Sequence, residues 1–298
     1  MLPKDQPTQL YRGRFAPSPS GDLHFGSLIA AVGSYLEAKR HHGEWLLRIE
    51  DLDPPRVVTG ASSAILKTLE QHHLYWDHPV LYQSKQTKQY HQALKQLATS
   101  GLLFGCHCTR NQLKEHRLYP GNCINAALSL DYHAVRIQAE TMTLSTRDPW
   151  QGVQRWPLKQ AVGDFIIRRA DGVYSYQLAV VVDDYLQKIT HVVRGSDLLD
   201  STPRQIYLQQ KLDYPPPLYS HLPVAGGRNG NKLSKQNLAK PLNSATAPQN
   251  IFQALQFLGQ HPPQDLERSS LTTLWQWAEE NWKADHVPHQ PMITVEFR

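Results

Sequence analysis

The stretch RFAPSPSGDLHFGS, from Arg14 to Ser27, decides the fold of this 298-residue chain. It begins within a short strand-like segment, YRGRFA at 11–16, and leads into a helical pattern that starts at Ser27. The apolar residues of that pattern recur at the spacing of one face of an amphipathic helix. The sequence therefore predicts a strand, then a loop stiffened by two prolines, and then a helix.

The start of this helix is suited to hold a phosphate group. The first N–H groups of a helix have no partners within it, and the helix dipole is positive at this end. Gly26 lets a ligand approach the backbone, and a ring nitrogen of His24 can donate to a phosphate oxygen. Gly-rich turns before helices are common and most are structural, so this motif alone leaves phosphate binding open.

The rest of the pattern extends this unit into an α/β domain. Alternating strands and helices predict a parallel sheet with right-handed crossovers. Run 164–184 carries further strand signals around a turn at ADG. Thr202 and Pro203 are expected as N-cap and first residue of a helix. The remaining expected elements are strands at 44–50, 189–195 and 218–225, helices at 59–72 and 87–100, and two helices after residue 240.

A second candidate for phosphate binding is NKLSKQ, at 231–236 in a glycine-rich loop. Lys232 and Lys235 flank a serine and are three residues apart, so both can reach one polyphosphate. A solvated basic loop is the alternative, since most such runs are solvated. The segment is not a Walker A loop, because the chain has no G-x-x-x-x-G-K-[ST] motif.

All three cysteines lie within eighteen residues, at Cys106, Cys108 and Cys123. An odd number argues against a disulfide framework, whereas C-x-C followed by a third cysteine offers three soft ligands for a tetrahedral Zn²⁺. Unrelated free thiols are the alternative. A histidine is the usual fourth ligand, and the side chains in range are His107, His116 and Tyr119.

The formal net charge is +5, and Lys and Arg are spread along the chain. This balance fits a mildly basic enzyme or a protein that binds a polyanion such as nucleic acid. The apolar runs are too short to span a bilayer, and MLPKDQPTQL has no secretory signal pattern. We therefore expect a cytoplasmic protein without membrane association.

Taken together, these motifs resemble the class I aminoacyl-tRNA synthetases. PSPSGDLHFGS is similar to their HIGH signature and KLSKQ to their KMSKS signature. RIEDLDPPR and VVDD…ITHVVRGSDLLDSTPRQ resemble the glutamyl branch, so the likeness covers about residues 10–240. Two departures exist: the chain leaves no room for anticodon-binding domains, and KQN follows where full-length enzymes carry Arg-His. In both features the chain resembles a truncated branch of the family, whose members attach glutamate to the queuosine base of tRNA(Asp).

The resemblance implies a class I synthetase fold, with a Rossmann-like parallel sheet and helices on both faces. An inserted zinc-bearing subdomain and a small C-terminal helical region complete it. The expected domains are the first half of the catalytic domain at 10–103, the insertion at 104–184, the second half with the KLSKQ loop at 185–240, and the helical region at 241–298.

The resemblance also implies an ATP-dependent ligase. It would activate L-glutamate as glutamyl-adenylate without tRNA, and then transfer it to the queuosine cyclopentenediol at the wobble position of tRNA(Asp). Mg²⁺ would accompany ATP, and we expect a monomer. His24 and Lys235 are the expected catalytic residues. The expected ATP-binding residues are His24, Gly26, Ser27, Lys232 and Lys235.

Glutamate carries two carboxylates and an ammonium, so its pocket needs cations, an anion and a hydrogen-bond donor. Ligands bind at the carboxyl ends of strands in α/β sheets, where the sequence places several such groups. The expected glutamate pocket is Arg14, Phe15, Ala16, Pro17, Ser18, Glu50, Tyr176 and Arg194. For the metal, the family pattern favours Tyr119 as the fourth ligand.

Other acidic and aromatic residues receive structural interpretations. The reaction needs no acid–base pair, so we expect supporting roles for Asp51, Asp53, Asp183 and Asp184. The tail tryptophans Trp275, Trp277 and Trp282 are expected to pack against the catalytic domain rather than stack on bases. Two rival functions stay open: a shortened conventional glutamyl-tRNA synthetase that charges a tRNA 3′ end, and a non-catalytic tRNA-binding relative.

Overall fold

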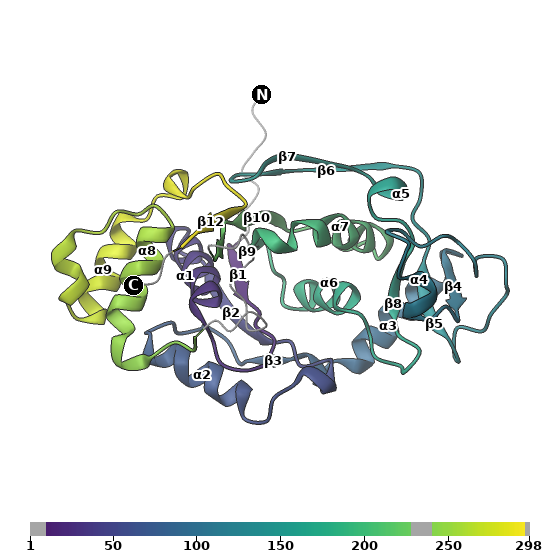
Figure 1. Cartoon of the computed structure of the whole chain (residues 1–298), viewed down its shortest axis with the longest axis horizontal. Coiled ribbons are helices and arrows are strands. Elements are labelled where there is room, and N and C mark those ends of the chain that lie inside the picture. Colours follow the sequence, from purple (N-terminus) through teal and green to yellow (C-terminus); the bar gives the residue numbers. More distant parts are fainter. Residues whose placement is uncertain (1–9, 228–239, 296–298) are drawn as a thin grey trace.

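The computed structural model describes residues 10–227 and 240–295, and its centre is a parallel sheet (Figure 1). β1 pairs with β2, β2 with β3, and β9 with β10, all in parallel. The N–H of Thr190 donates to the C=O of Arg12 over 3.0 Å and places β9 beside β1. The strand order is therefore β3-β2-β1-β9-β10. The strands are β1 (Arg12–Phe15), β2 (Glu44–Ile49), β3 (Leu81–Tyr82), β9 (His191–Gly195) and β10 (Leu218–Leu222).

Helices cover both faces of this sheet, as the alternation of side chains along β2 requires. Trp45 and Leu47 pack into one core with α1, α8 (Ala247–Phe257) and α9 (Leu271–Asn281), whereas Leu46 packs into a second core with α3, α6 and α7. The expected layer architecture is thus observed. The helices around the sheet are α1 (Phe25–Arg40), α2 (Ala61–Gln71), α3 (Thr87–Ala98), α6 (Tyr176–Leu186) and α7 (Thr202–Lys211).

Helix α1 lies close against the sheet because Gly33 faces β10. A Cβ atom at Gly33 would come within 2.6 Å of the Leu222 side chain, so a larger residue would push the helix away. Its first turn is closed by a reciprocal pair of bonds between His24 and Ser27. The helix start is therefore held at a fixed distance from the strand ends.

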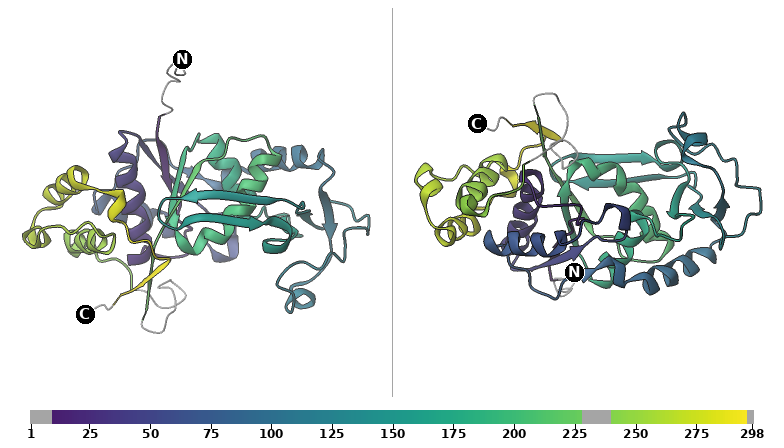
Figure 2. Two further views of the ribbon diagram at one scale, coloured as in Figure 1. Left: turned by 90° about the horizontal axis from the view of Figure 1, so that it is seen from above. Right: turned by 60° about the horizontal axis from the view of Figure 1, so that its bottom comes forward.

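Between α3 and α6 the chain forms an insertion, and three of its strands, β4, β5 and β8, make an antiparallel sheet at one end of the molecule (Figure 2). From it a hairpin, β6–β7, runs back over α7 toward β10 and the C-terminal region (Figure 1). The expected boundary at 184 falls inside α6. The elements of the insertion are β4 (Leu103–Cys106), α4 (Arg110–Leu113), β5 (Ala134–Ile137), β6 (Thr143–Asp148), β7 (Gly152–Pro157), α5 (Leu158–Ala161) and β8 (Phe165–Arg168).

The C-terminal helices pack on α1 and α2. The Trp275 indole N–H donates to the C=O of His72 over 2.8 Å, and that of Trp282 donates to Oε1 of Glu37 over 2.6 Å. These contacts confirm the packing interpretation of the tail tryptophans. The elements here are β11 (Val224–Gly226), α8 (Ala247–Phe257), α9 (Leu271–Asn281) and β12 (Met292–Thr294), with β11 and β12 parallel.

Three expectations about local structure were wrong. Residues 176–186 form helix α6 rather than a strand, because Ser175 caps them and the apolar run is buried between α3 and α7. Short apolar runs do not distinguish a buried strand from a buried helix. Helix α2 starts after Gly60 rather than at Thr59, and α7 is preceded by Ser201, with Thr202 as its first residue.

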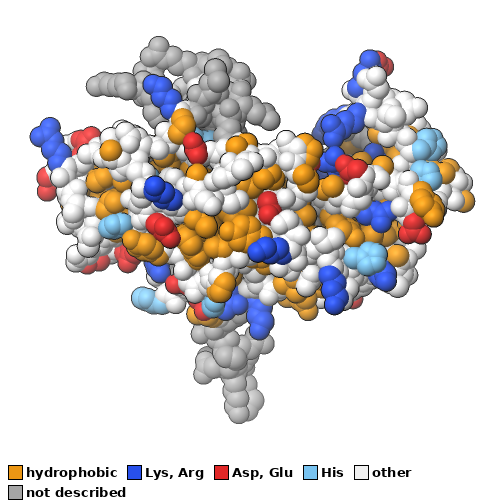
Figure 3. Space-filling model, turned by 90° about the horizontal axis from the view of Figure 1, so that it is seen from below, with side chains coloured by type: hydrophobic (Ala, Val, Ile, Leu, Met, Phe, Trp, Pro, Cys, Tyr) orange, Lys and Arg blue, Asp and Glu red, His pale blue; other side chains and the backbone are white. Residues whose placement is uncertain are grey.

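The surface carries charges of both signs. On the face shown in Figure 3, Lys and Arg side chains are dispersed among acidic and hydrophobic ones rather than gathered in one patch. No helix in the two described ranges is long and apolar enough to cross a lipid bilayer.

Candidate active site

A cavity of about 470 Å³ opens where β1, β2 and β9 end and α1 begins. It lies at the carboxyl edge of the sheet, the usual ligand site of this architecture. The structure brings together most of the expected residues. Those that line the cavity are Arg14, Phe15, Ala16, Ser18, His24, Gly26, Ser27, Glu50, Tyr176 and Arg194.

Of the expected residues that the structure describes, Pro17 does not line the cavity. Its C=O accepts the N–H of Glu50 over 3.0 Å. Lys232 and Lys235 lie outside the described residues. The described flanks of that segment do reach the cavity: Ala225 lines it on one side, and Pro241 forms a β-bridge with His24 on the other.

His24 is the N-cap of α1. Its ring Nδ1 accepts the N–H of Ser27 over 3.3 Å, and its own N–H donates to Oγ of Ser27 over 2.8 Å. A neutral ring that accepts at Nδ1 carries its proton on Nε2. His24 therefore lines the cavity as a neutral donor beside the positive end of a helix.

Arg14 is anchored by a buried carboxylate. Its Nε donates to Oδ1 of Asp184 over 3.1 Å, and Arg48 donates to the same oxygen over 2.8 Å. Burial alone would raise the pKa of Asp184, but the two guanidinium groups outweigh it and the pKa is lowered. Asp184 therefore stays ionised and fixes Arg14 at the cavity wall.

Glu50 contributes the anionic side of the cavity. It follows β2 directly, and its Oε1 lies 3.7 Å from Nε of the buried Arg48. Burial raises the pKa of Glu50 to about 7, because Arg48 and Arg14 compensate only part of the lost hydration. At neutral pH this carboxyl is thus close to its midpoint, and a cation in the cavity would favour its ionised form.

Arg194 is held more firmly than the sequence could indicate. Its side chain is 4% exposed, and each of its three nitrogens donates to the protein. The hydroxyl of Tyr176 is the most distant partner, at 3.5 Å from Nη1. The other acceptors are Nε2 of His221 at 3.0 Å, Oε1 of Gln205 at 2.8 Å, Oγ1 of Thr202 at 2.9 Å and the C=O of Leu198 at 3.3 Å.

The four aspartates make the kind of contacts expected of supporting residues. Asp51 accepts from the N–H and hydroxyl of Ser84, and Asp53 pairs with Arg56 and Arg169. Asp183 accepts from Gln83 and Tyr90. The four do not line the cavity.

Sequence reasoning missed two charged residues of the wall, Arg56 and Asp197. Both stand in segments that the sequence had already marked, RIEDLDPPR and VVRGSDLLD, so the signal was present but unassigned. Asp53 holds the exposed Arg56 at 2.7 Å and keeps its charge at the cavity.

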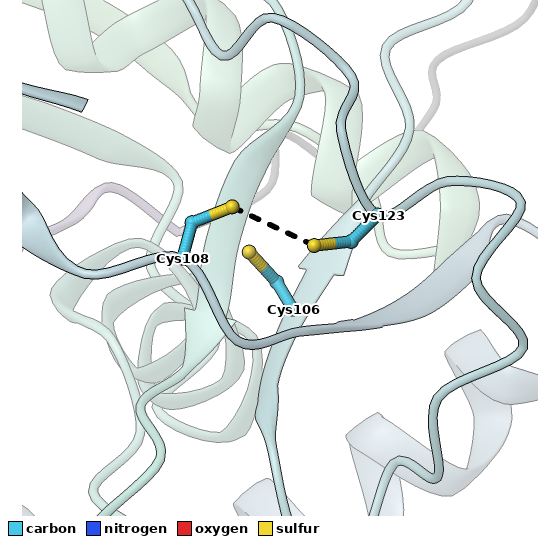
Figure 4. Close-up of side chains that lie close together, drawn as sticks. All are labelled: Cys106, Cys108 and Cys123. Atoms are coloured by element: carbon cyan, nitrogen blue, oxygen red, sulfur yellow. Dashed lines mark hydrogen bonds between the residues drawn. The ribbon is translucent and has the colours of Figure 1, made fainter. Parts of the chain in front are cut away.

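The three cysteines converge in the insertion (Figure 4). Their sulfur atoms all lie within 4.8 Å of one another, and those of Cys108 and Cys123 are 3.5 Å apart. The hydroxyl of Tyr119 lies 3.6 Å from the Cys106 sulfur and 3.9 Å from that of Cys108. Nδ1 of His107 approaches only Cys123, at 3.8 Å. The cluster can bind a metal ion, and Tyr119 reaches more of it than His107 does.

The site geometry agrees with a family comparison. The sequence profile of a family described as tRNA synthetases class I (E and Q), catalytic domain, matches residues 11–267. The chain belongs to this family. The expected enzyme class, a ligase of the aminoacyl-tRNA synthetase type, is thereby confirmed.

Among the class I synthetases, three similar curated relatives all carry one name. The glutamyl-Q tRNA(Asp) synthetase of Dechloromonas aromatica is 48% identical and aligns with 96% of this chain and 98% of its own length. Proteins of the same name are 48% identical in Aromatoleum aromaticum, with coverages of 94% and 91%, and 46% identical in Vibrio vulnificus, with 96% and 94%. The expected resemblance to the short glutamyl branch is confirmed.

Solved structures of class I synthetases share the fold. A glutamate-tRNA synthetase from Elizabethkingia anophelis superposes with a TM-score of 0.81 at 21% identity, over 97% of this chain and 68% of that one. A glutamate tRNA ligase from Elizabethkingia meningosepticum, solved with its amino acid, gives 0.79 at 23% identity, over 95% and 66%. This likeness confirms the expected class I synthetase α/β fold.

Proposed function

We propose that the chain is an ATP-dependent ligase that activates L-glutamate and attaches it to the queuosine of tRNA(Asp). One observation carries the proposal: Arg14, Glu50 and Arg194 share a cavity with the start of α1. These groups match a carboxylated amino acid on one side and a phosphate on the other. The names of the full-length relatives support the queuosine acceptor.

In this proposal glutamate occupies the strand ends. Its carboxylates face Arg14, Arg194 and the hydroxyl of Tyr176, and its ammonium faces Glu50. Arg14 suits this task because its bonds to Asp184 use Nε and Nη2, which leaves Nη1 without a hydrogen bond to the described residues. The 3.5 Å bond from Nη1 of Arg194 to the hydroxyl of Tyr176 is its longest, so it is the one that glutamate replaces most easily. Nη1 is therefore the atom of Arg194 that binds the substrate.

ATP occupies the helix side. The Nε2–H of His24 and the backbone N–H of Gly26 donate to phosphate oxygens, in the manner of other helix N-termini, and Ser27 lines the same side of the cavity. Lys235, with Lys232 as a weaker candidate, neutralises the β- and γ-phosphates. Mg²⁺ bound to the nucleotide supplies further positive charge.

The reaction is then one of positioning. A glutamate carboxylate oxygen attacks the α-phosphorus of ATP, the bond to the bridging oxygen breaks, and pyrophosphate leaves. No protein nucleophile or base is needed, so held geometry and charge neutralisation carry the rate. A hydroxyl of the queuosine cyclopentenediol next attacks the activated carbonyl and AMP leaves. The first step proceeds without tRNA.

The cysteine cluster fits a structural zinc ion. Three thiolates suit a closed, four-coordinate zinc site, and the Tyr119 phenolate would be an uncommon fourth ligand. The negative charge of these four ligands would exceed the positive charge of Zn²⁺, and the guanidinium of Arg136 would offset part of the excess. Its Nε donates to the Cys106 sulfur over 3.3 Å, and its guanidinium lies 4.0 Å from the centre of the Tyr119 ring. Bound zinc would cross-link a small unit that has little apolar core.

The decisive assay offers radiolabelled glutamate with ATP and tRNA(Asp) that carries or lacks queuosine. We expect label only on the queuosine-bearing tRNA, and glutamate-dependent pyrophosphate exchange with no tRNA present. Equal labelling of both tRNAs, or labelling of tRNA(Glu) at its 3′ end, would instead indicate a shortened conventional synthetase. Absence of both exchange and tRNA labelling would indicate a non-catalytic relative.

A further inference from the structure

Behind Arg194 lies a line of buried polar groups that the reaction itself does not use. Nε of Arg194 donates to Nε2 of His221 over 3.0 Å, and Nδ1 of His221 lies 2.6 Å from Oδ2 of Asp148. The exposed fractions of Asp148, His221 and Arg194 are 1%, 0% and 4%. Three elements far apart in the chain, β6, β10 and β9, therefore meet at one hydrogen-bonded line.

The two outer groups determine the state of the histidine. An ionised carboxylate only accepts, so Nδ1 of His221 carries a proton, whereas the guanidinium only donates, so Nε2 carries a lone pair. His221 is therefore neutral in a single tautomer. Burial lowers the pKa of His221, which agrees with the neutral form.

Asp148 is fixed by its own turn. Its other oxygen, Oδ1, accepts the N–H groups of Trp150 and Gln151 over 2.9 and 3.0 Å, at the tip of the β6–β7 hairpin. The amide of Gln151 donates to the C=O of His221 over 2.9 Å and ties the same tip to β10. The hairpin thus delivers a carboxylate in one orientation to the back of the substrate site.

We infer that Asp148 and His221 are positioning residues that aim Arg194 into the glutamate pocket by keeping a lone pair of His221 directed at the arginine Nε. The inference rests on the proposed function of Arg194. Hydrogen bonds to charged groups are the stronger ones, so loss of this bond should weaken glutamate binding about tenfold or more. ATP binds at the far side of the cavity and should be unaffected.

Three variants separate this role from a general structural one. Asp148→Asn keeps the acceptor for the hairpin turn but presents an amide N–H to His221, which moves the ring proton to Nε2, against Arg194. His221→Gln retains an acceptor near the position of Nε2, whereas His221→Asn retains only a donor near that of Nδ1. Matched controls are Asp213→Asn and His289→Gln, at exposed positions without a hydrogen-bonded side chain among the described residues.

The measurement is glutamate-dependent pyrophosphate exchange, with calorimetric titration of glutamate as a second readout. We expect Asp148→Asn and His221→Asn to raise the KM for glutamate and the Kd about tenfold. The KM for ATP and kcat should stay within about twofold, as for a loss of uniform binding. His221→Gln should recover most of the affinity that His221→Asn loses. If Asp148→Asn fails to fold, the contrast between the two His221 variants decides.

The result that would overturn the inference is also specific. If His221→Gln and His221→Asn raise the KM for glutamate equally, or raise the KM for ATP as much, the line merely supports the fold. An unchanged KM for glutamate in Asp148→Asn and His221→Asn has the same consequence. Absence of exchange in the wild-type protein would overturn the proposed function as well, so the two failures can be told apart.

Discussion

Arg14 and Arg48 both donate to one oxygen of the buried Asp184, from β1 and β2 respectively. Two cations thus meet at one carboxylate, and the fully buried Arg48 also lies 3.7 Å from Glu50. Charges buried without a partner are costly, and removal of one member of such a group destabilises a protein by about 3–5 kcal/mol. Asp184 therefore serves both the stability of the sheet and the aim of Arg14.

The first prediction concerns Asp184→Asn. We expect it to lower the free energy of unfolding by about 3 kcal/mol, because an amide cannot offset two guanidinium charges. Its KM for glutamate should also rise, since Arg14 loses its anchor. Urea unfolding measures the first effect and pyrophosphate exchange the second. Asp213→Asn, an exposed change of the same charge, is the control, and equal stability of the two variants would contradict the prediction.

The second prediction follows from Glu50. The pKa of Glu50 is about 7 in the folded protein and 4.5 in the unfolded chain, where the carboxyl is not buried. Between these two pH values the folded state therefore binds more protons than the unfolded state. Stability therefore falls as pH rises through that window, and Glu50→Gln removes the effect. The variant should gain stability relative to wild type between pH 5 and pH 8, by at most about 3 kcal/mol. Parallel stability curves for the two proteins, measured by urea unfolding, would exclude this role.

The third prediction separates the two roles of His24. His24→Asn keeps a good N-cap for α1 but shortens the side chain, whereas His24→Ala also removes the cap, at a cost of about 1 kcal/mol. We expect both to lower kcat for exchange by about 100-fold, as for removal of one charge-stabilising donor. Only His24→Ala should lower Tm appreciably. Wild-type kcat in His24→Asn would show that the ring serves the helix alone.

The fourth prediction concerns the cysteine cluster. Protein purified without chelators should hold close to one zinc per chain by elemental analysis, and Cys123→Ser should lose it. Tyr119→Phe should retain zinc but release it faster to a chelator, since three thiolates remain. His107→Ala should behave as wild type. Zinc release that is faster in His107→Ala than in Tyr119→Phe would assign the fourth ligand to the histidine instead.

The sequence predicted the residues that line the cavity better than the buried hydrogen bonds that support them. Arg14 to Ser27 form a continuous motif whose loop and helix start follow from local rules, and half of its residues line the cavity. Helix α6 was missed because its apolar run lacks the polar face that marks an exposed helix. Nothing local marks His221 either, since its partner Asp148 stands 73 positions away and only the fold brings them together.

The tryptophans of the C-terminal region have one further consequence. The indole of Trp282 donates to Glu37 of α1, whose exposed fraction is 8%, and the indole of Trp275 donates to the C=O of His72, at the end of α2. A cut near residue 241 would remove the indole donor of Glu37 and expose the apolar face of α1 to water. The region is therefore not a detachable module. Fusion of a foreign RNA-binding domain should be attempted beyond β12, with α8 and α9 left in place.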